Sequence, residues 1–398
     1  AAAALRALPF GTCTFHSGNR FAHAVATCAR RRSVLVMRHC AFPDRRDRVG
    51  QRIPRVLGYV VAVSMSSWVS ACSADREAVA VRESRIAQPD STRLLAVAGA
   101  EINSGPTWSI GPAPETIIEA SDDPGPYDLY GVRDVVRLSD GRIVAAPQHG
   151  PIQIFDRQGK HLATSGRKGE GPGEYQQIMS IGRLAGDTIA TFDNMLGRIS
   201  LYTPGGKFIR SLSVGSLVGQ FDGVFTIDGR FVGSRPVRSG RPTDELWRED
   251  LELVEIDLKD GRRTTLAPYR GRLMLGMASA PFSPRFLLAA AGTRLYASES
   301  DEFKVDVFNE HRLTASLVAD LPRVPVTAED LQRWMEADVG IRAKEDAYEA
   351  FLASIKGRAP EYHRQLSQLL GSTDGYLWIA PQQPNAEGNF HWLVLNPD

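Results

Sequence analysis

A unit of strand, turn, strand, loop, strand, turn and strand recurs along this chain and constrains its fold more than any other feature. The first copy reads Val135-Val-Arg-Leu-Ser-Asp-Gly-Arg-Ile-Val-Ala-Ala146, followed by Ile152-Gln-Ile-Phe-Asp-Arg-Gln-Gly-Lys-His-Leu-Ala-Thr164. Short apolar runs separated by Asp-Gly and similar glycine-containing turns are typical of β-hairpins. The unit therefore predicts a four-stranded meander.

Further copies of this unit follow over residues 178–214, 223–266 and 286–321, and from residue 369 to the end. A repeat of about 40–50 residues that holds four strands is typical of a β-propeller, in which each copy forms one blade. A β-sandwich is the alternative fold for a chain of short strands. The recurring turn chemistry favours the propeller.

The number of blades depends on the two ends of the repeat region. Five copies are visible, a lone strand near Trp108–Ile110 precedes them, and the last copy stops after three strands, at Asp398. In a closed ring the lone strand would pair with C-terminal strands that this sequence lacks. We therefore predict an all-β, six-bladed β-propeller over residues 106–398 with its last blade truncated.

One segment, at about 327–370, interrupts the strand pattern and predicts a helical insertion before the final visible blade. Thr327 is a suitable N-cap, and acidic residues follow it in the first turn. The pattern continues over Glu345–Ile355 and Tyr362–Leu370. Apolar side chains recur at helical spacing at Leu331, Trp334, Met335 and Val339. We expect the insertion to pack on the propeller, and a gating lid is the alternative.

Residues 45–72 predict a secretory signal segment. Five arginines precede an uncharged, mostly apolar stretch from Val56 to Trp68, and small residues then lead to Cys72. The apolar stretch is shorter than the roughly 20 residues of a membrane-spanning helix. Its end resembles the bacterial lipobox, which implies that Cys72 carries a lipid and becomes the mature N-terminus. Ser73 after the cysteine resembles sorting to the outer rather than the inner membrane.

The regions on either side of this segment lack the signs of a folded domain. Residues 1–44 predict a non-native or unstructured extension, and residues 73–105, rich in Ser, Ala, Pro and charge, predict a tether. All four cysteines lie at or before Cys72, so the body has no disulfides. Residues 1–72 hold 11 of the 47 Lys and Arg but 2 of the 46 Asp and Glu, which leaves the body at −8. An acidic body argues against a nucleic-acid partner.

The glycine-rich run Ser165-Gly-Arg-Lys-Gly-Glu-Gly-Pro-Gly-Glu-Tyr175 superficially suggests a phosphate-binding loop. Its lysine is followed by glycine instead of Ser or Thr, so it is not a Walker loop. No helix follows it, so it is not a dinucleotide fingerprint either. The run lies between two copies of the repeat, where glycine supplies backbone angles that other residues avoid. We therefore interpret it as a structural connection between blades.

The same run carries a resemblance to a known family. A glycine-rich run ending in Gly-Pro-Gly-Glu-Tyr after the turn Asp156–Lys160, behind a lipobox, resembles bacterial six-bladed β-propeller lipoproteins related to NHL-repeat proteins. Thr373-Asp-Gly-Tyr-Leu-Trp378 resembles a strand of that family too. The resemblance implies the fold and a lipid-anchored location in the bacterial cell envelope, but no particular chemistry. The matching motif residues are Gly166, Gly169, Gly171, Pro172, Gly173, Glu174 and Tyr175.

A candidate site is expected on one face of the propeller. The loops between second and third strands share a face with the connections between blades, and that face commonly carries function. Each polar residue of those loops fits a solvated surface position by itself, but together they would form one rim. We name them the predicted rim residues: His149, Asp193, Asn194, Arg235, Glu299, Asp301 and Gln382.

Two classes of function follow. The first is a binding or interaction module for a protein, peptide or glycan, held at a membrane by its lipid. The second is a propeller hydrolase, lactonase or lyase that depends on a divalent cation. The chain lacks a Gly-x-Ser-x-Gly elbow, a His-Glu-x-x-His motif and a cysteine in its body, so the binding module is favoured and no catalytic residue is assigned. The oxygen ligands that Ca²⁺ prefers occur at Asp193, Asn194, Glu299 and Asp301.

Overall fold

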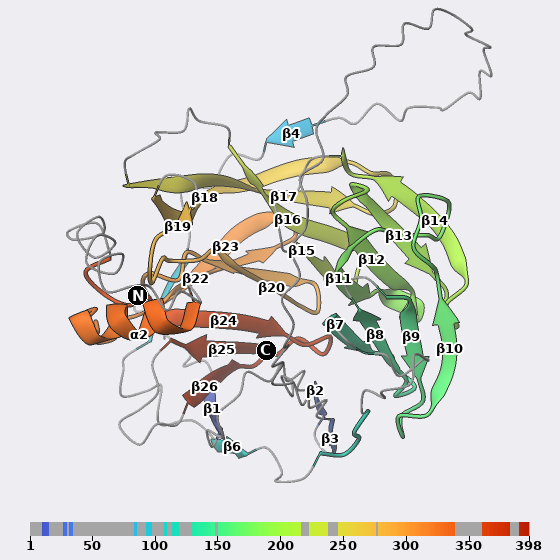
Figure 1. The fold of residues 1–398 in the computed structure, drawn as a ribbon, viewed down its shortest axis with the longest axis horizontal. Coiled ribbons are helices and arrows are strands. Elements are labelled where there is room, and N and C mark those ends of the chain that lie inside the picture. The colour runs from blue at the N-terminus through green and yellow to red at the C-terminus, as the bar shows by residue number, and fades with distance from the viewer. Residues whose placement is uncertain are drawn as a thin grey trace, which may run out of the picture.

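A computed structural model describes fifteen separate stretches of this chain. The described residues are 10–15, 27–29, 32–34, 83–85, 93–97, 107–109, 114–118, 129, 131–147, 150–215, 223–237, 246–275, 278–338, 360–382 and 390–397. Within them, five sheets of four or more strands form the blades of a β-propeller (Figure 1). Cys72 and His149 lie outside the described residues.

Blades 1 and 2 are plain four-stranded antiparallel meanders, as the sequence repeat predicts. Blade 1 consists of β7 (Val132–Arg137), β8 (Ile143–Pro147), β9 (Ile152–Phe155) and β10 (His161–Ser165). Blade 2 consists of β11 (Ile178–Arg183), β12 (Ile189–Asp193), β13 (Arg198–Tyr202) and β14 (Phe208–Ser213).

Blades 3 and 4 each carry a further parallel strand on their outer edge. Blade 3 consists of β15 (Gly223–Thr226), β16 (Arg230–Pro236), β17 (Leu246–Asp257) and β18 (Arg263–Leu275), with the short β19 (Ala278–Ser279) beside β18. Blade 4 consists of β20 (Leu287–Ala291), β21 (Arg294–Ser298), β22 (Lys304–Asn309) and β23 (Arg312–Ala319).

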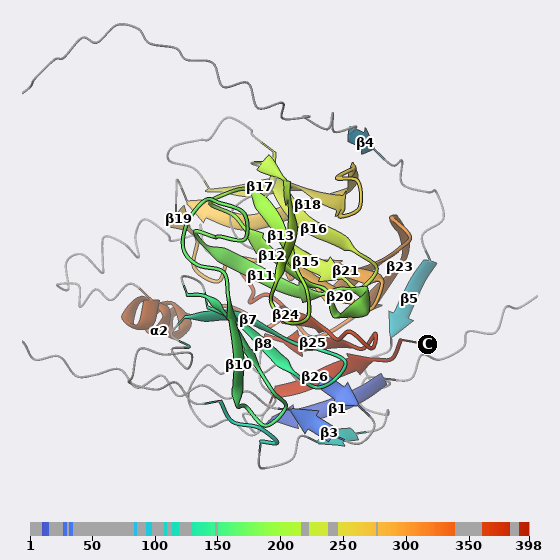
Figure 2. The same cartoon turned by 90° about the vertical axis from the view of Figure 1, so that its right-hand side faces the viewer.

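The added strands come from the segment for which the composition predicts a tether. Strand β4 (Glu83–Arg85) pairs with β18, and β5 (Arg93–Val97) pairs with β23 (Figure 2). Both pairings are parallel. They supply hydrogen-bond partners to backbone groups on sheet edges that would otherwise be open. Two stretches of residues 73–105 therefore run along the outer edges of blades 3 and 4.

Blade 5 differs from the prediction in its outer strands. It consists of β24 (Leu366–Gly371), β25 (Leu377–Pro381) and β26 (Phe390–Leu395), and β1 (Phe10–Phe15) pairs antiparallel with β26 in the position of a fourth strand. Strand β6 (Thr107–Ser109), predicted as part of a sixth blade, pairs instead with β1. The described residues therefore form five blades, and the prediction of six is wrong for this structure. Strands β2 (Thr27–Ala29) and β3 (Arg32–Val34) form a separate hairpin.

The predicted helical insertion at about 327–370 is helical at its start and not at its end. Helix α2 (Ala328–Asp338) begins after the N-cap Thr327, whose hydroxyl accepts the Asp330 N–H at 3.1 Å. Residues 345–355 lie outside the described part of the chain. The predicted helix over Tyr362–Leu370 is wrong, because β24 begins at Leu366 and its apolar residues pack against blade 4. No helix among the described residues is long and apolar enough to cross a membrane.

The hydrophobic core lies between the blades. Four apolar clusters each join one pair of neighbouring blades, from blades 1 and 2 through to blades 4 and 5. The innermost strands β7, β11, β15, β20 and β24 pack side by side in this order (Figure 1). Alternate side chains of each strand therefore face the next blade, which explains why the strands are apolar on both faces.

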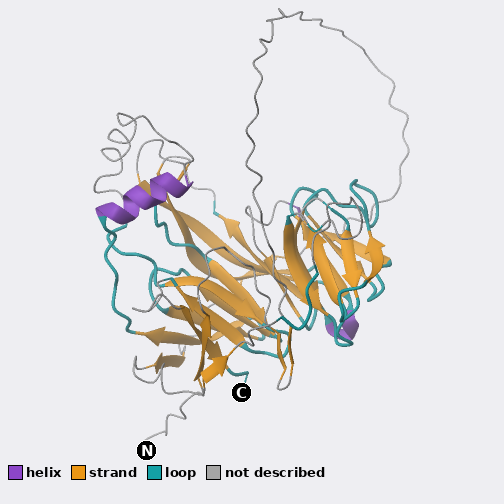
Figure 3. Ribbon diagram, turned by 60° about the horizontal axis from the view of Figure 1, so that its bottom comes forward, coloured by secondary structure: helices purple, strands orange, loops and turns teal. Residues whose placement is uncertain are grey.

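The two faces of the propeller follow from the antiparallel pairing within each blade. The turns that join strands 1–2 and strands 3–4 lie on one face, which we call the hairpin face. The loops that join strands 2–3, and the connections between blades, lie on the other, which we call the connector face. Helix α2 and the short 3-10 turn η1 (Ala185–Asp187) lie at opposite ends of the blades in Figure 3, on the connector and hairpin faces respectively.

Backbone hydrogen bonds link the turns of the hairpin face from blade to blade. The Ala185 N–H of blade 2 donates to the Ile227 carbonyl of blade 3 at 2.7 Å. The Ile227 N–H donates to the Gly292 carbonyl of blade 4 at 3.1 Å, and the Gly292 N–H donates to the Ser372 carbonyl of blade 5 at 3.0 Å. One relay of peptide groups therefore connects four blades independently of side-chain identity.

Side chains extend this relay to blade 1. The Ser139 N–H donates to the Asp187 carboxylate at 3.0 Å, and the Arg183 Nε donates to the same carboxylate at 2.7 Å. The Arg183 Nη1 also reaches the Thr373 hydroxyl of blade 5 at 3.5 Å. Asp187 adopts a φ of +60°, which a non-glycine residue rarely does, so these contacts compensate for backbone strain.

Gly371 offers a test of the relay, because a Cβ there would lie 1.8 Å from the Ala290 carbonyl oxygen of the neighbouring blade. The main chain cannot yield without breaking the adjacent link between Gly292 and Ser372. We expect Gly371→Ala to lower the free energy of unfolding by about 3 kcal/mol or more in urea titrations.

Gly205→Ala is the matched control, since its nearest neighbour is 3.9 Å away in an exposed turn and its effect should stay within about 0.5 kcal/mol. Equal stabilities of the two variants would contradict the packing described between blades 4 and 5.

Candidate functional site

The predicted rim residues lie on the connector face, but the structure does not bring them together as one site. Asp193 and Asn194 belong to blade 2, Arg235 to blade 3, Glu299 and Asp301 to blade 4, and Gln382 to blade 5. His149 lies outside the described residues. The side chains of five of the six described residues form hydrogen bonds with residues of their own or a neighbouring blade, as set out below.

Asp193 is a buried structural carboxylate, with 3% of the residue exposed. Its Oδ2 accepts the N–H groups of Gln176 and Gln177 at 2.6 and 3.1 Å, and its Oδ1 accepts the Leu196 N–H at 2.9 Å. The carboxylate therefore fixes the connection between blades 1 and 2 onto the loop after β12. The neighbouring Asn194 has a buried Oδ1 without a hydrogen-bond partner among the described residues.

The other acidic rim residues are joined by one arginine. Asp301 accepts two hydrogen bonds from the Arg248 guanidinium, one of them at 2.7 Å, and Glu299 lies 3.6 Å from the same group. Glu299 also accepts the Arg270 N–H at 2.8 Å. Within the part of the chain that the structure describes, no three His, Cys, Asp or Glu side chains gather as metal ligands. The four predicted Ca²⁺ ligands therefore do not form one site. Asp193 and Asn194 lie in blade 2, whereas Glu299 and Asp301 contact Arg248.

The two remaining rim residues also have partners. Arg235 donates to the Glu252 carboxylate at 2.5 Å across blade 3. Gln382 accepts a hydrogen bond from the Arg364 Nε at 2.8 Å. Arg364 is a residue that the sequence analysis did not single out, and the Gln382 contact is the link between the predicted rim and this arginine.

The glycine-rich motif connects blades 1 and 2. Gly166 and Gly173 both have a φ of +76°, and a Cβ on Gly166 would lie 2.6 Å from the Tyr175 ring. The Glu174 carboxylate accepts the Gly171 N–H at 2.8 Å and the Arg167 Nε at 2.5 Å, and these contacts lower the pKa of Glu174. Tyr175 is buried in the core between blades 1 and 2, where burial raises the pKa of its hydroxyl.

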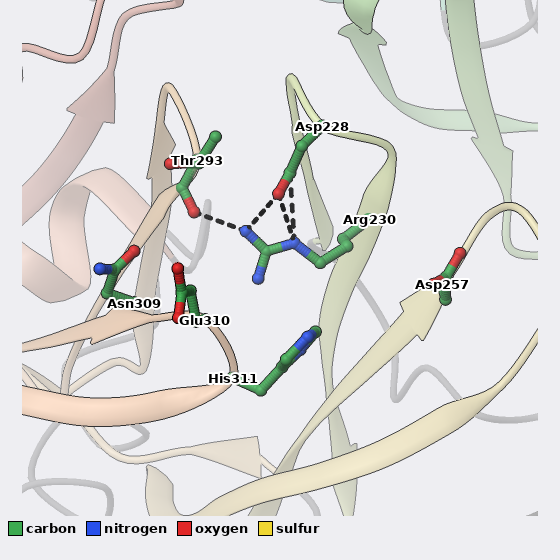
Figure 4. A pocket seen from close by; sticks show the side chains of 7 residues that line it. All are labelled: Asp228, Arg230, Asp257, Thr293, Asn309, Glu310 and His311. Atoms are coloured by element: carbon green, nitrogen blue, oxygen red, sulfur yellow. Dashed lines mark hydrogen bonds and ion pairs between the residues drawn. The ribbon is translucent and has the colours of Figure 1, made fainter.

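A cavity of about 310 Å³ opens on the hairpin face between blades 3 and 4 (Figure 4). It lies on the face opposite the predicted rim, among the turns after β15, β17, β20 and β22. Its lining residues are Asp228, Arg230, Asp257, Thr293, Asn309, Glu310 and His311. Sequence reasoning missed them because it assigned function to the connector face.

Arg230 organises this cavity. Its side chain is 8% exposed, and its guanidinium contacts Asp228 at 2.9 Å, the buried Glu255 at 2.9 Å and the Thr293 carbonyl at 2.6 Å. Burial opposes the charge of Arg230, but Asp228 and Glu255 raise the pKa of its guanidinium. Because its nitrogens are already engaged by protein acceptors, Arg230 shapes the wall and has little capacity left for an anion.

His311 stands on a strained hairpin turn at the edge of the cavity. Glu310 and His311 have φ values of +46° and +67°, the backbone of a type I′ turn that normally holds Asn-Gly. Non-glycine residues in this region cost about 1–3 kcal/mol each. The His311 Nδ1 contacts the Glu255 carboxylate, which is 2% exposed, and this contact fixes the ring. A glycine-free turn, Asn309-Glu-His-Arg312, was the signal in the sequence that could have drawn attention here.

The lining of the cavity is acidic. Three carboxylates, those of Asp228, Asp257 and Glu310, share the lining with one guanidinium, so the carboxylates outnumber it by two. Asp228 is paired with Arg230, and Asp257 lies 3.9 Å from Arg262. Glu310 has no ion pair among the described residues. The cavity can therefore accept a cation at Glu310 and can use His311 in proton transfer.

Comparisons with known proteins show likeness of structure only. No protein-family model and no curated protein sequence matches this chain. A member of the DUF4221 family from Bacteroides vulgatus is 12% identical, with 67% of this chain and 93% of that chain covered and a TM-score of 0.39. A protein from Bacteroides fragilis described as exported is also 12% identical, with 66% and 70% covered and a TM-score of 0.36.

Propeller enzymes are among the similar structures as well. A gluconolactonase from Xanthomonas campestris is 13% identical, with 65% of this chain and 73% of that chain covered and a TM-score of 0.32. A streptogramin B lyase is 10% identical, with 67% and 94% covered and a TM-score of 0.30. Identities and TM-scores this low carry no conclusion about what this chain binds or catalyses.

Asp193 gives the prediction that separates a structural carboxylate from a metal ligand. Asp193→Ala would leave three backbone N–H groups without their acceptor, so we expect it to lower the free energy of unfolding by about 3 kcal/mol. The exposed Asp374→Ala should change it by less than about 0.5 kcal/mol. If Asp193 were a Ca²⁺ ligand instead, Ca²⁺ would raise the thermal midpoint of the wild type, and Asp193→Ala would abolish that rise.

Proposed function

We propose that this chain is a binding propeller of the bacterial cell envelope, anchored by a lipid on Cys72, whose cavity takes a cationic group of a peptide or protein. The anchor and the location rest on the signal segment at residues 45–72 and on its lipobox-like end. The ligand class rests on the cavity between blades 3 and 4. A neutral glycan would not use the charge of that cavity, so a basic peptide fits better.

The observation that carries this proposal is the carboxylate of Glu310, which lines an acidic cavity and has no ion pair within the part of the chain that the structure describes. The other charged groups of the wall pair with protein partners, so Glu310 is the acidic group of the lining available to a ligand. An ammonium or guanidinium beside it would form a charge-assisted hydrogen bond. The side chain of lysine or arginine is such a group.

The size and rigidity of the cavity agree with this ligand. Small-molecule sites usually occupy about 300–1,000 Å³, so a cavity of about 310 Å³ suits one side chain and little more. The Arg230 contacts and the strained turn fix the walls before a ligand arrives. A preformed wall reduces the entropy that binding must overcome.

The test is a ligand titration monitored by saturation-transfer NMR. We expect the methylamides of acetyl-lysine and acetyl-arginine to bind, and the methylamide of acetyl-glutamate not to bind. Glu310→Gln should weaken the cationic ligands about tenfold, since one charge-assisted hydrogen bond contributes about 1.5 kcal/mol. Glu170→Gln, which changes an exposed carboxylate on the connector face, should leave binding unchanged. Equal binding of the glutamate compound would overturn the proposal.

A second candidate function is the cation-dependent hydrolase, lactonase or lyase, and the contact between His311 and Glu255 favours it. A buried carboxylate on one imidazole nitrogen orients the ring and leaves the other nitrogen for a proton. His311 lines the cavity, so its Nε2 is the candidate general base there. A divalent cation would have fewer than three protein ligands there, because no three His, Cys, Asp or Glu side chains of the described residues gather as metal ligands.

Proton release from a panel of lactones and esters, measured by pH-stat titration with Ca²⁺ and with EDTA, tests this second candidate. A general base contributes about 10²–10⁴-fold, so His311→Gln should lower any rate by at least about 100-fold. His161→Gln changes a histidine on β10 of blade 1 and should have no effect. Turnover that survives in His311→Gln, or no turnover across the panel, would eliminate this candidate.

A further inference from the structure

Two arginines occupy the same position in adjoining blades on the connector face. Arg285 lies two residues before β20, and Arg364 lies two residues before β24. These innermost strands pack side by side. The structure therefore places both residues where the innermost strands of blades 4 and 5 begin, on the face opposite the acidic cavity.

Arg364 is a partly buried cation that has only neutral partners. Its Nε donates to the Gln382 side-chain oxygen at 2.8 Å, and its Nη1 donates to the Ser283 carbonyl at 3.3 Å. Within the described residues, no carboxylate pairs with Arg364 or with the exposed side chain of Arg285. Burial and, to a smaller extent, the charge of Arg285 together lower the pKa of Arg364 to about 10. A buried cation beside a like charge is costly unless an anion compensates it.

The surroundings hold Arg364 in place before any ligand binds. The preceding residue, His363, is 8% exposed, and its ring packs edge-on against Phe282 with centroids 4.8 Å apart. The His363 Nε2 lies 3.1 Å from the Asp330 carboxylate at the start of helix α2. Although burial opposes it, contacts with Thr327 and His363 lower the pKa of Asp330 to about 2. The helix thereby fixes the backbone that carries Arg364.

The acceptor side of the site is equally fixed. Ser283 is buried, its hydroxyl accepts the Leu273 N–H at 2.6 Å, and its own N–H donates to the Ala280 carbonyl at 3.2 Å. The Ser283 carbonyl is therefore a stationary partner for Arg364. One edge of the guanidinium is used by protein acceptors, and its Nη2 has no protein partner among the described residues.

We propose that Arg285 and Arg364 form a binding site for a doubly charged oxyanion, a phosphate group, on the connector face. Two guanidinium groups match the charge and the oxygen array of a phosphate better than those of one carboxylate. The same chemistry serves free phosphate and a phosphomonoester on a larger ligand. This site is separate from the cavity beside Glu310, and it is independent of the cationic ligand proposed there.

Isothermal titration of the full chain with inorganic phosphate, glucose 6-phosphate and glucuronate, at constant ionic strength, tests the proposal. We expect both phosphates to bind and to raise the thermal midpoint, since a ligand that binds the folded state stabilises it. Glucuronate, a single carboxylate, should bind at least about tenfold more weakly. A higher affinity for glucose 6-phosphate than for inorganic phosphate would identify a phosphomonoester as the source of the group.

Arg285→Gln and Arg364→Gln should each weaken phosphate binding at least about tenfold. Arg157→Gln, which changes an exposed arginine of blade 1 on the hairpin face, and Glu310→Gln should not weaken it. If Arg364→Gln does not fold, the phosphate affinity of Arg285→Gln, which changes an exposed side chain, decides the test alone. Absence of phosphate binding to the wild type, or equal binding by Arg285→Gln and the wild type, would overturn the proposal.

Discussion

The relay of peptide hydrogen bonds across the hairpin face is the constraint on which the rest of this structure depends. It runs from Ala185 through Ile227 and Gly292 to Ser372 and so sets the spacing between the innermost strands of four blades. That spacing decides which side chains meet between blades, both in the apolar clusters and at the two candidate sites. Because the relay uses main-chain groups, it tolerates varied turn sequences but needs small residues such as Gly371 beside it.

The local pattern predicted the blades well, because turn chemistry and strand periodicity act over a few residues. The Ser139-Asp-Gly-Arg142 turn and the Asp156–Lys160 turn lie where the sequence indicates them. The outer strands were not predictable, since the pairing of Phe10–Phe15 with β26 joins residues from opposite ends of the sequence. The helix over Tyr362–Leu370 failed because apolar spacing in a short segment fits a helix and a buried strand equally well.

The candidate sites were harder to predict, because the role of a polar residue on a loop depends on the residues that it contacts. Asp193 looked like a metal ligand, yet its oxygens accept two backbone N–H groups of the connection before its blade and one of the loop that follows it. Gln382 was on the predicted rim, but its significance is its contact with Arg364. The cavity depends on Glu255 and His311, which are 56 residues apart and belong to different blades. No spacing rule would have joined them.

The two faces of the propeller carry opposite chemistry: an acidic cavity lies on the hairpin face, and two arginines without a carboxylate partner among the described residues lie on the connector face. This separation is the central claim, and a crystal structure grown with acetyl-lysine methylamide and phosphate tests it most directly. We predict the ammonium group within hydrogen-bond distance of the Glu310 carboxylate, and a phosphate that contacts Arg285 and Arg364. A lysine compound bound outside the cavity, or a phosphate bound away from the two arginines, would contradict it.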